Sequence, residues 1–463
     1  MSLKVHITTF GCQMNKLDSE LLAHALTAEG MELCGQNDEA DVLVFNTCSV
    51  RQHAENRVLT CLGRLEEQKK NRPCLIGAVV GCMAQREGRE LLERFPGLDI
   101  ACGPGELHRL GEMIEEVGAG AGQQLAVTEH LRARREVPAG LEELDSGRSA
   151  GSAAGKAQAY VRVMRGCDKF CSYCIVPSVR GREISRSPQQ IVEEVKRLVD
   201  GGCIEITLLG QTVNSYRYRD GGREVRFGEL LRIIGEEEGL ERLRFVTSHP
   251  KEFTDDIFRA MAEVPTVCEY LHMPTQSGSD RVLAAMKRGY TSAEYLELIE
   301  RGRDIVPGLS LAGDFIVGFC GETDEDFQVT VRMVEAARYK NCFVFKYSPR
   351  PGTAAARNLA DDVPVEIKKK RNNELLAVQE GISLGINRGF IGRTVEILVE
   401  GPSKTARKRP LSSGRQMTGR TRGDHIVVFD ASEVSGEPAG RLVKVSIRDA
   451  SALTLFGEFE GLV

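Results

Sequence analysis

Apolar residues in the first quarter of the chain form short continuous runs, and the segments between them carry apolar residues at helical spacing. The apolar runs cover residues 4–10, 41–48, 74–82 and 98–103. Continuous β-branched runs of this length are typical of parallel strands that are buried on both faces, and the intervening spacing is that of amphipathic helices. The pattern therefore predicts a doubly wound α/β domain, which we assign to residues 1–135.

The alternation stops over residues 136–156, which are rich in Gly, Ala and Ser with little periodicity, and we interpret this segment as a linker. Between residues 157 and 384 the alternation returns with a longer period. Its expected strands cover residues 160–166, 205–210, 242–248, 269–276, 311–319 and 342–348. About six βα units predict a full or partial parallel barrel of the (β/α)6 kind, with its chemistry at the carboxyl ends of the strands.

The pattern changes again over residues 385–463, where short strand-like runs follow one another without helices. These runs cover residues 394–400, 425–430, 441–450 and 454–460. They predict a small antiparallel β-barrel with the size and pattern of oligonucleotide-binding (OB) barrels. The expected fold class is thus α/β with a small β-barrel at its end.

Composition narrows the classes of protein that fit. The chain has 463 residues, and 61 Lys and Arg against 66 Asp and Glu give a net charge of −5, so any surface for nucleic acid must be local. The first residues lack the charged and apolar regions of a signal peptide, and the longest apolar run, residues 74–84, is too short to span a bilayer. We therefore expect a cytoplasmic protein without a membrane partner, in which some of the 14 cysteines serve metal or catalytic chemistry.

Three cysteines, Cys167, Cys171 and Cys174, follow the first expected strand of the barrel within eight residues. Thiolates bind soft metals and iron–sulfur clusters. A zinc site would want a fourth Cys or His nearby, and none follows soon after Cys174. A zinc knuckle or a chance group of core cysteines is the alternative to a four-iron cluster whose open iron binds a substrate or cofactor.

Three further cysteines lie at the ends of expected strands in the first domain: Cys12, Cys48 and Cys82. Because the carboxyl ends of parallel strands open onto one crevice, these thiols can converge on one point. The alternative, scattered buried thiols, fits the cysteines that lie within or beside elements better. Cys102 ends a fourth strand and could be another ligand or a nearby spare.

The spacing Cys-x3-Cys-x2-Cys directly after the first barrel strand resembles the signature of the radical S-adenosylmethionine (SAM) superfamily. Together with TFGCQMNKLDSE, NTCSVRQHAENRV and GCMAQREGRE, it resembles the methylthiotransferases along nearly the whole chain. SHPKEFTDDI and DFIVGFCGETDEDF look like the barrel of that family, and LSSGRQMTGRTRGD looks like its C-terminal TRAM domain. GQTVNSY and YSPRPGT most resemble the branch that modifies an isopentenylated adenosine beside the tRNA anticodon. The branches that act on threonylcarbamoyladenosine or on a ribosomal-protein aspartate are the alternative.

This resemblance implies a transferase that converts the C–H bond at C2 of N6-isopentenyl(dimethylallyl)adenosine into C–S–CH3. No polar acid or base readily breaks that bond, so a radical cofactor is needed. The resemblance implies two 4Fe-4S clusters, an auxiliary one on Cys12, Cys48 and Cys82 and a radical-generating one on Cys167, Cys171 and Cys174, with SAM as methyl donor and radical source. A purely structural role for one triad, an iron–sulfur carrier and a sulfur inserter for small molecules are the alternatives.

Residues at the strand ends are candidates for SAM contacts: Tyr173, Gly210, Gln211, Ser248, Gln276 and Gly318. The two glycines could instead be ordinary turn residues, and Ser248 a helix cap. Thr275 and Cys320 stand where the family pattern has Val and Pro, which makes the pocket assignments beside them less secure.

Between Gly401 and Gly423 the sequence has no acidic residue, and its basic residues predict local RNA contacts on the C-terminal barrel: Lys404, Arg407, Lys408, Arg409, Arg415, Arg420 and Arg422. Such a charge run could also be a solvated loop. Arg180, Arg182 and Arg186, just past the second triad, could steer the anticodon arm or form surface salt bridges. The expected partners are a tRNA anticodon stem-loop that carries isopentenyladenosine and an external electron donor, and the expected state is a monomer.

Overall fold

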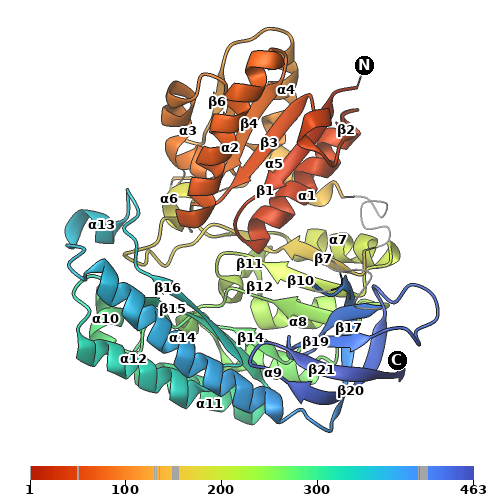
Figure 1. Cartoon of the computed structure of the whole chain (residues 1–463), viewed down its shortest axis with the longest axis vertical. Helices are drawn as coiled ribbons and strands as arrows, with labels where there is room; N and C mark the ends of the chain where they lie inside the picture. The colour runs from red at the N-terminus through yellow and green to blue at the C-terminus, as the bar shows by residue number, and fades with distance from the viewer. Residues whose placement is uncertain are drawn as a thin grey trace.

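The computed structural model describes residues 2–49, 52–129, 131, 133–134, 136–148, 156–404, 406 and 415–463. Its elements form an N-terminal sheet with helices on both faces, a central set of six parallel strands with outer helices, and a C-terminal β-barrel (Figure 1). The carboxyl ends of the central strands face the N-terminal sheet, and the C-terminal barrel lies at their opposite ends.

The N-terminal sheet is entirely parallel, with the strand order β2-β1-β3-β4-β5-β6. Its elements are β1 (Lys4–Thr9), α1 (Gln13–Ala28), β2 (Glu32–Leu33), η1 (Asn37–Glu39), β3 (Val42–Thr47), α2 (Gln52–Asn71), β4 (Ile76–Gly81), α3 (Cys82–Arg94), β5 (Ile100–Cys102), η2 (Leu107–Arg109), α4 (Leu110–Gly118) and β6 (Gln124–Ala126). Val42 and Val44 of β3 pack with α1 and α4, whereas Leu43 and Phe45 pack with α2 and α3. Both faces are thus covered, as the continuous apolar runs predict.

The segment interpreted as a linker is partly structured. It contains α5 (Ala139–Ser146), whose Leu141 and Leu144 join the apolar cluster beneath α1. The buried carboxylate of Asp145 pairs with arginines of the barrel. Packing against neighbouring units, rather than periodicity in this short stretch, stabilises the helix.

The central strands run in chain order and in parallel, as two three-stranded sheets, β7-β10-β13 and β14-β15-β16, joined by a bridge between Leu243 and Val267. They are β7 (Gln158–Arg162), β10 (Glu205–Leu209), β13 (Arg242–Phe245), β14 (Tyr270–His272), β15 (Ser310–Val317) and β16 (Asn341–Lys346). The helices are α6 (Val176–Val179), α7 (Pro188–Asp200), α8 (Phe227–Gly235), α9 (Asp255–Glu263), α10 (Asp280–Ala285), α11 (Ser292–Ile305), α12 (Asp324–Ala337), α13 (Ala354–Asn358) and α14 (Val365–Arg388). The 3-10 turns are η4 (Val213–Ser215) and η5 (Pro250–Glu252).

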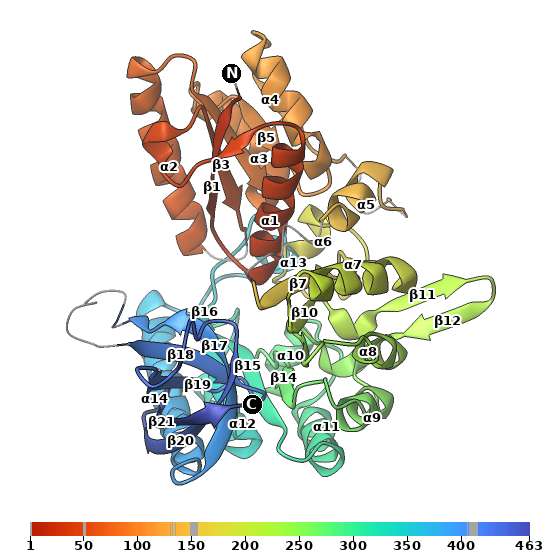
Figure 2. The same cartoon turned by 90° about the vertical axis from the view of Figure 1, so that its right-hand side faces the viewer.

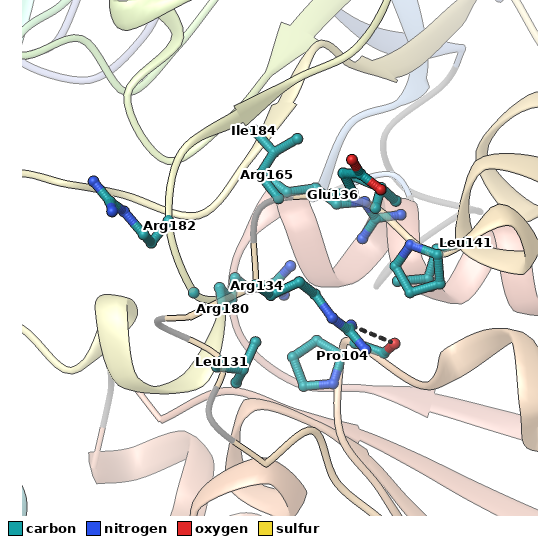
Figure 3. Close-up of a pocket in the computed structure, with 13 residues that line it drawn as sticks. Pro104, Leu131, Arg134, Glu136, Leu141, Arg165, Arg180, Arg182 and Ile184 are labelled. Carbon is teal, nitrogen blue, oxygen red and sulfur yellow. Dashed lines mark hydrogen bonds between the residues drawn. The ribbon is translucent and has the colours of Figure 1, made fainter.

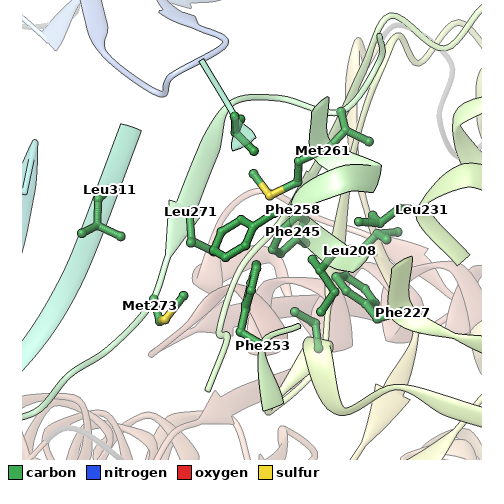
Figure 4. Close-up of a cluster of buried hydrophobic side chains, with 14 of the residues drawn as sticks. Leu208, Phe227, Leu231, Phe245, Phe253, Phe258, Met261, Leu271, Met273 and Leu311 are labelled. Atoms are coloured by element: carbon green, nitrogen blue, oxygen red, sulfur yellow. The ribbon is translucent and has the colours of Figure 1, made fainter. Parts of the chain in front are cut away.

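Two short additions accompany the barrel. β8 (Met164–Arg165) pairs with β9 (Ile184–Ser185), and the hairpin of β11 (Arg217–Asp220) and β12 (Arg223–Arg226) projects from its side (Figure 2). The main core lies between strands and outer helices, where Leu208, Phe245 and Leu271 of the strands meet Leu231 of α8 and Phe258 of α9 (Figure 4). This core holds the strand ends in fixed positions.

The C-terminal unit is a closed barrel with the order β17-β18-β19-β21-β20. Its strands are β17 (Thr394–Pro402), β18 (Gln416–Thr421), β19 (Ile426–Asp430), β20 (Leu442–Ala450) and β21 (Leu455–Leu462). The pairing of β19 with β21 is parallel and the others are antiparallel. A five-stranded closed barrel is the OB-like architecture that the pattern predicts.

The turn between β18 and β19 closes the amino ends of the central strands. Arg244 of β13 donates to the backbone oxygens of Thr421 and Arg422, at 2.7 and 2.8 Å. Lys340 pairs with Asp424 at 3.0 Å. These contacts fasten the C-terminal barrel to the floor of the central one.

The strand positions and the α/β class are confirmed, and five features were not expected: the short strands β2, β6 and β9, the strand β18 and the β11–β12 hairpin. β18 was not anticipated because its sequence, QMTGRT, contains only one large apolar residue. The β11–β12 hairpin was not anticipated because it is rich in arginine. No helix among the described residues is long and apolar enough to cross a membrane.

Candidate active site

The N-terminal cysteines gather at the carboxyl edge of the first sheet. Cys12 precedes α1, Cys48 follows β3, and Cys82 is the first residue of α3 after β4. The β1 and β3 loops flank the point where the strand order reverses, which is the usual position of a binding crevice in such a sheet. The predicted convergence of these three residues on one edge is therefore present.

The thiols of this triad interact directly. A hydrogen bond with Cys48 lowers the pKa of Cys12 to about 6, against the opposing effect of burial and with help from the Arg180 cation. Burial raises the pKa of Cys82, and Arg180 opposes that rise. Gly11 has φ +118°, and a Cβ there would lie 2.3 Å from the Cβ of Cys48, so only glycine allows this approach.

Cys102 behaves as a core residue. It is fully buried, its sulfur contacts the carbonyl of its neighbour Gly103, and it packs in the apolar cluster of α1 and α4. Burial raises the pKa of its thiol far above the usual value. Cys102 thus matches a nearby cysteine that is not a ligand rather than a fourth cluster ligand.

A positively charged group lies beside the first triad. Arg180, from the barrel, places Nε 3.3 Å from the sulfur of Cys82 and donates to Asp18 at 2.8 Å and to Asn15 at 3.4 Å. Asp18 also pairs with Arg162. Burial alone would raise the pKa of Asp18, but Arg180 and Arg162 hold it below its usual value.

The second triad lies in the loop between β8 and α6. Cys167 Sγ is 3.4 Å from Thr212 Oγ1, and Cys171 Sγ is 3.4 Å from Arg288 Nη1. Burial, followed by the proximity of Cys171, raises the pKa of Cys174 to about 12. Gly166, just before this loop, has φ +73°, and a Cβ there would lie 1.8 Å from the backbone oxygen of Arg182.

Sequence reasoning missed Arg288, which Cys171 meets across 117 residues of chain. Arg288 also donates to the Pro274 carbonyl at 2.8 Å and to Tyr290 at 2.9 Å. The sequence around it, KRGYT, does not by itself indicate contact with a cysteine. Ser172 anchors the same loop, since its backbone N–H donates to Met286.

The polar candidates for SAM contacts share the rim of the barrel with unpaired buried atoms. Gln211 Oε1, Ser248 Oγ and His249 Nε2 are buried without a hydrogen-bond partner. Gln276 has φ +77°, a strained conformation for a residue with a side chain. Buried polar groups that lack partners fit a site whose ligand supplies them.

The other candidates at the rim have packing roles. A Cβ on Gly210 would lie 2.5 Å from Met164, and one on Gly318 would lie 2.3 Å from the side chain of Lys368. Tyr173 packs edge-on against Phe319, with ring centroids 6.5 Å apart. These three residues shape the site through close packing.

A small pocket separates the N-terminal unit from the second triad's loop (Figure 3). Four arginines line it: Arg134, Arg165, Arg180 and Arg182. Arg134 contacts the Gly105 carbonyl, and Arg165 pairs with Asp145 at 2.7 Å. The pocket thus lies between the two units and is lined by arginines that are each paired with a carboxylate.

The arginines after the second triad are engaged within the protein. The Arg180 side chain is 7% exposed and the Arg186 side chain 3%, so neither faces an approaching tRNA. Arg186 pairs with Glu194 at 2.7 Å, and Arg182 pairs with Asp168 at 3.2 Å. All three residues thus form salt bridges, but those of Arg180 and Arg186 are buried rather than on the surface.

The basic residues of the C-terminal barrel divide into three groups. Lys404 is exposed, and Arg407, Lys408 and Arg409 lie outside the described residues. Arg415 donates to backbone carbonyls of Val434 and Gly436. Arg420 and Arg422 face carboxylates.

Arg420 pairs with Glu400 and Asp424, both at 2.9 Å. Arg422 crosses to the central barrel and pairs with Glu269 at 2.8 Å. Arg420 therefore links β17 to the β18–β19 turn within the C-terminal barrel, and Arg422 holds that barrel against the central one.

Each triad supplies three thiolates, the ligand type that iron–sulfur clusters use. Among the described residues, no three His, Cys, Asp or Glu side chains are arranged to hold one metal ion. The cations of Arg180 and Arg288 beside Cys82 and Cys171 suit groups that carry negative charge.

Two family models match the chain. Residues 4–103 match the uncharacterized protein family UPF0004, and residues 161–334 match the radical SAM superfamily. A solved radical S-adenosylmethionine methyltransferase, TsrM from Kitasatospora setae, superposes with a TM-score of 0.54 at 17% identity over 77% of each chain. That likeness shows the fold alone.

Full-length relatives are much more similar. The tRNA-2-methylthio-N(6)-dimethylallyladenosine synthase of Rhodopirellula baltica is 48% identical over 460 residues, which are 99% of this chain and 95% of that protein. The enzyme of that name from Moorella thermoacetica is 43% identical over 98% of this chain and 97% of its own length.

The matched domains and the strand-end cysteines define a radical SAM transferase. Within that class, the chain belongs to the family of tRNA-2-methylthio-N(6)-dimethylallyladenosine synthases. The predicted family, fold class, enzyme class and cofactor types, SAM and 4Fe-4S clusters, are confirmed. A tRNA substrate is implied by the family's name.

Proposed function

We propose that this chain methylthiolates C2 of N6-isopentenyladenosine next to the anticodon of tRNA. The observation that carries the proposal is the close approach of the two triads across two units: Cys82 of the first triad packs on Ile175, the residue directly after Cys174 of the second. In a chain 48% identical to a named synthase, this geometry supports one site with two clusters. Action on threonylcarbamoyladenosine or on a ribosomal-protein aspartate is the alternative function.

In this proposal the six cysteines hold the clusters: Cys12, Cys48 and Cys82 the auxiliary one, and Cys167, Cys171 and Cys174 the other. When bound, the clusters and SAM supply the electron, the radical source, the sulfur and the methyl group that turn C–H into C–S–CH3. An open coordination position on each cluster follows from three ligands per triad.

The chain's own residues orient these groups. Arg288 and Thr212 fix the thiols of Cys171 and Cys167. Gln211, Ser248 and His249 offer unpaired polar atoms to SAM, and Gln276 lies in the loop after β14 in a strained conformation. The apolar walls of Phe319 and Tyr173 exclude water from this side of the site.

The remaining partners are also proposals. We infer a monomer that works in the cytoplasm with an external electron donor and binds the anticodon stem-loop through phosphate contacts. The modified base is splayed out of its stack to reach the clusters. Lys404 and the undescribed Arg407, Lys408 and Arg409 are the candidates for those contacts, because Arg420 and Arg422 are occupied by carboxylates.

The test is anaerobic turnover with SAM, a reductant and two anticodon stem-loops, one isopentenylated and one threonylcarbamoylated. We expect methylthio product on the isopentenylated RNA only. Product on only the threonylcarbamoylated RNA would overturn the substrate assignment. Iron analysis should give about eight irons per chain, and only about four would overturn the two-cluster site.

A further inference from the structure

A short segment of the barrel connects the two triads directly. Cys174 belongs to the second triad. Ile175, the residue before the single turn of α6, and Val179, the last residue of that turn, pack on Cys82 of the first triad. Arg180 then ends this segment with its Nε 3.3 Å from the sulfur of Cys82. Seven residues therefore reach from a ligand of one proposed cluster to a ligand of the other.

The Arg180 cation is deeply buried, and burial of a charge is costly unless it is paired. Its carboxylate partner is Asp18, at 2.8 Å, with the side chains 7% and 1% exposed. Asp18 is shared, because it also pairs with Arg162. One carboxylate thus pairs with two arginines, and the Nε of Arg180 lies against the Cys82 sulfur.

The same excess of arginines over carboxylates extends around the site. Asp145 pairs with Arg162, Arg165 and, at 4.0 Å, Arg186, so four arginines share the two carboxylates of Asp18 and Asp145. The nearby Arg186 has Glu194 as its closest carboxylate. Positive charge is thus in local excess, and the thiols of Cys12 and Cys82 are the acidic groups that Arg180 faces next. A cluster bound by thiolates is the negative group that would balance it.

We propose that Arg180 is a positioning residue for the auxiliary cluster: it orients the Cys82 thiolate and makes the cluster easier to reduce. The inference rests on the proposed assignment of Cys12, Cys48 and Cys82 as cluster ligands. A cation next to a cluster stabilises the reduced, more negative form, so its loss makes the reduction potential more negative. Because Arg180 lies in the segment that starts at Cys174, the loop of one cluster tunes the other.

The test measures the midpoint potential of the auxiliary cluster by EPR-monitored redox titration. The full chain carries Cys167→Ala and Cys171→Ala, so that only the auxiliary cluster loads while Cys174 and α6 keep their sequence. Arg180→Gln should shift the midpoint to more negative values. Arg180→Lys, which keeps the charge, should stay closer to the parent. Arg182→Gln, whose target pairs with Asp168 instead, is the matched control and should leave the midpoint unchanged.

The outcomes separate the two proposals. If the parent double variant binds no iron, the assignment of Cys12, Cys48 and Cys82 fails. If it binds about four irons and Arg180→Gln leaves the midpoint unchanged, the role of Arg180 is overturned. If Arg180→Gln prevents loading, Asp18→Asn is measured instead. That change removes a buried negative charge and should move the midpoint to more positive values, and no movement would overturn the inference.

Discussion

Arg162, the last residue of β7 in the barrel, forms a buried ion pair with Asp18 of α1 in the N-terminal unit. Both side chains are 1% exposed. Arg162 also pairs with Asp145 of α5, so one guanidinium ties together three elements from different parts of the chain. The relative position of the two triads depends on this link.

Replacement of Arg162 tests that link. Arg162→Met should lower the free energy of unfolding by about 3 kcal/mol, because it leaves buried carboxylates with too few cations. Denaturant unfolding of the purified chain measures the change. The control is Arg448→Ala, which removes an exposed pair with Glu458 and should change stability by no more than about 0.5 kcal/mol. Equal losses in the two variants would contradict the structural role of Arg162.

Gly11 is expected to be essential for the first triad. Gly11→Ala places a Cβ 2.3 Å from the Cβ of Cys48, in a backbone conformation of φ +118°. The variant should therefore bind about four irons per chain instead of about eight. Gly30→Ala is matched to it, because Gly30 also has positive φ, at +88°, but nothing lies within 4 Å of its Cβ position. Full iron content in Gly11→Ala would show that the approach of these loops is not required.

Ser248 carries a specific expectation for SAM. Its hydroxyl is buried without a partner at the end of β13, so Ser248→Ala removes a group that a ligand would satisfy. The dissociation constant of SAM, measured by calorimetry on the cluster-loaded protein, should rise about tenfold. Ser432→Ala, on the exposed surface of the C-terminal barrel, should leave it unchanged. An unaffected constant in Ser248→Ala would remove this residue from the SAM site.

The ion pair of Arg422 with Glu269 is expected to contribute to the free energy of unfolding but not to tRNA binding. A double-mutant cycle with Arg422→Ala and Glu269→Ala should give a coupling energy of about 1 kcal/mol in unfolding. The slope of log affinity for tRNA against log salt should stay the same in Arg422→Ala, because the side chain is held by Glu269. A fall of the slope by about one unit would show instead that Arg422 contacts phosphate.

His425 should make the junction of the two barrels sensitive to acid. Burial, followed by the Lys340 cation, lowers its pKa from 6.5 to about 4. The unfolded chain then binds a proton that the folded chain does not, so stability falls as the pH drops from 6.5 toward 4 and changes little above 6.5 from this source. His425→Gln should flatten that part of the curve in denaturant unfolding of the cluster-free protein. An unchanged curve would exclude His425 as the titrating group.

The sequence predicts those features of the fold that depend on local patterns. The β-branched runs place the strands, and the cysteines at their ends are correctly brought to one edge, because parallel strands share their direction. The contacts of Arg180 and Arg288 with cysteines were not predicted, since they join residues 98 and 117 positions apart. Pairings across such distances are decided by how the units dock, which local spacing does not encode.

Long-range pairing also explains why basic residues of the C-terminal barrel are less free than their sequence suggests. A run of arginines without acidic neighbours in sequence reads as a phosphate-binding surface. In space, Glu269, from a unit that precedes it by about 150 residues, pairs with Arg422. Charge in a short stretch of sequence therefore overstates the charge that is free on the folded surface.

The closure of the central barrel by the β18–β19 turn has a consequence for dividing this chain. Arg244 relies on the carbonyls of Thr421 and Arg422, and Arg242 relies on that of Arg420. Truncation before β17 would leave these guanidinium groups without their backbone acceptors. A shortened chain without the C-terminal barrel would thus also lose contacts that support the catalytic barrel. The C-terminal barrel is therefore an integral part of the enzyme's structure rather than a removable domain.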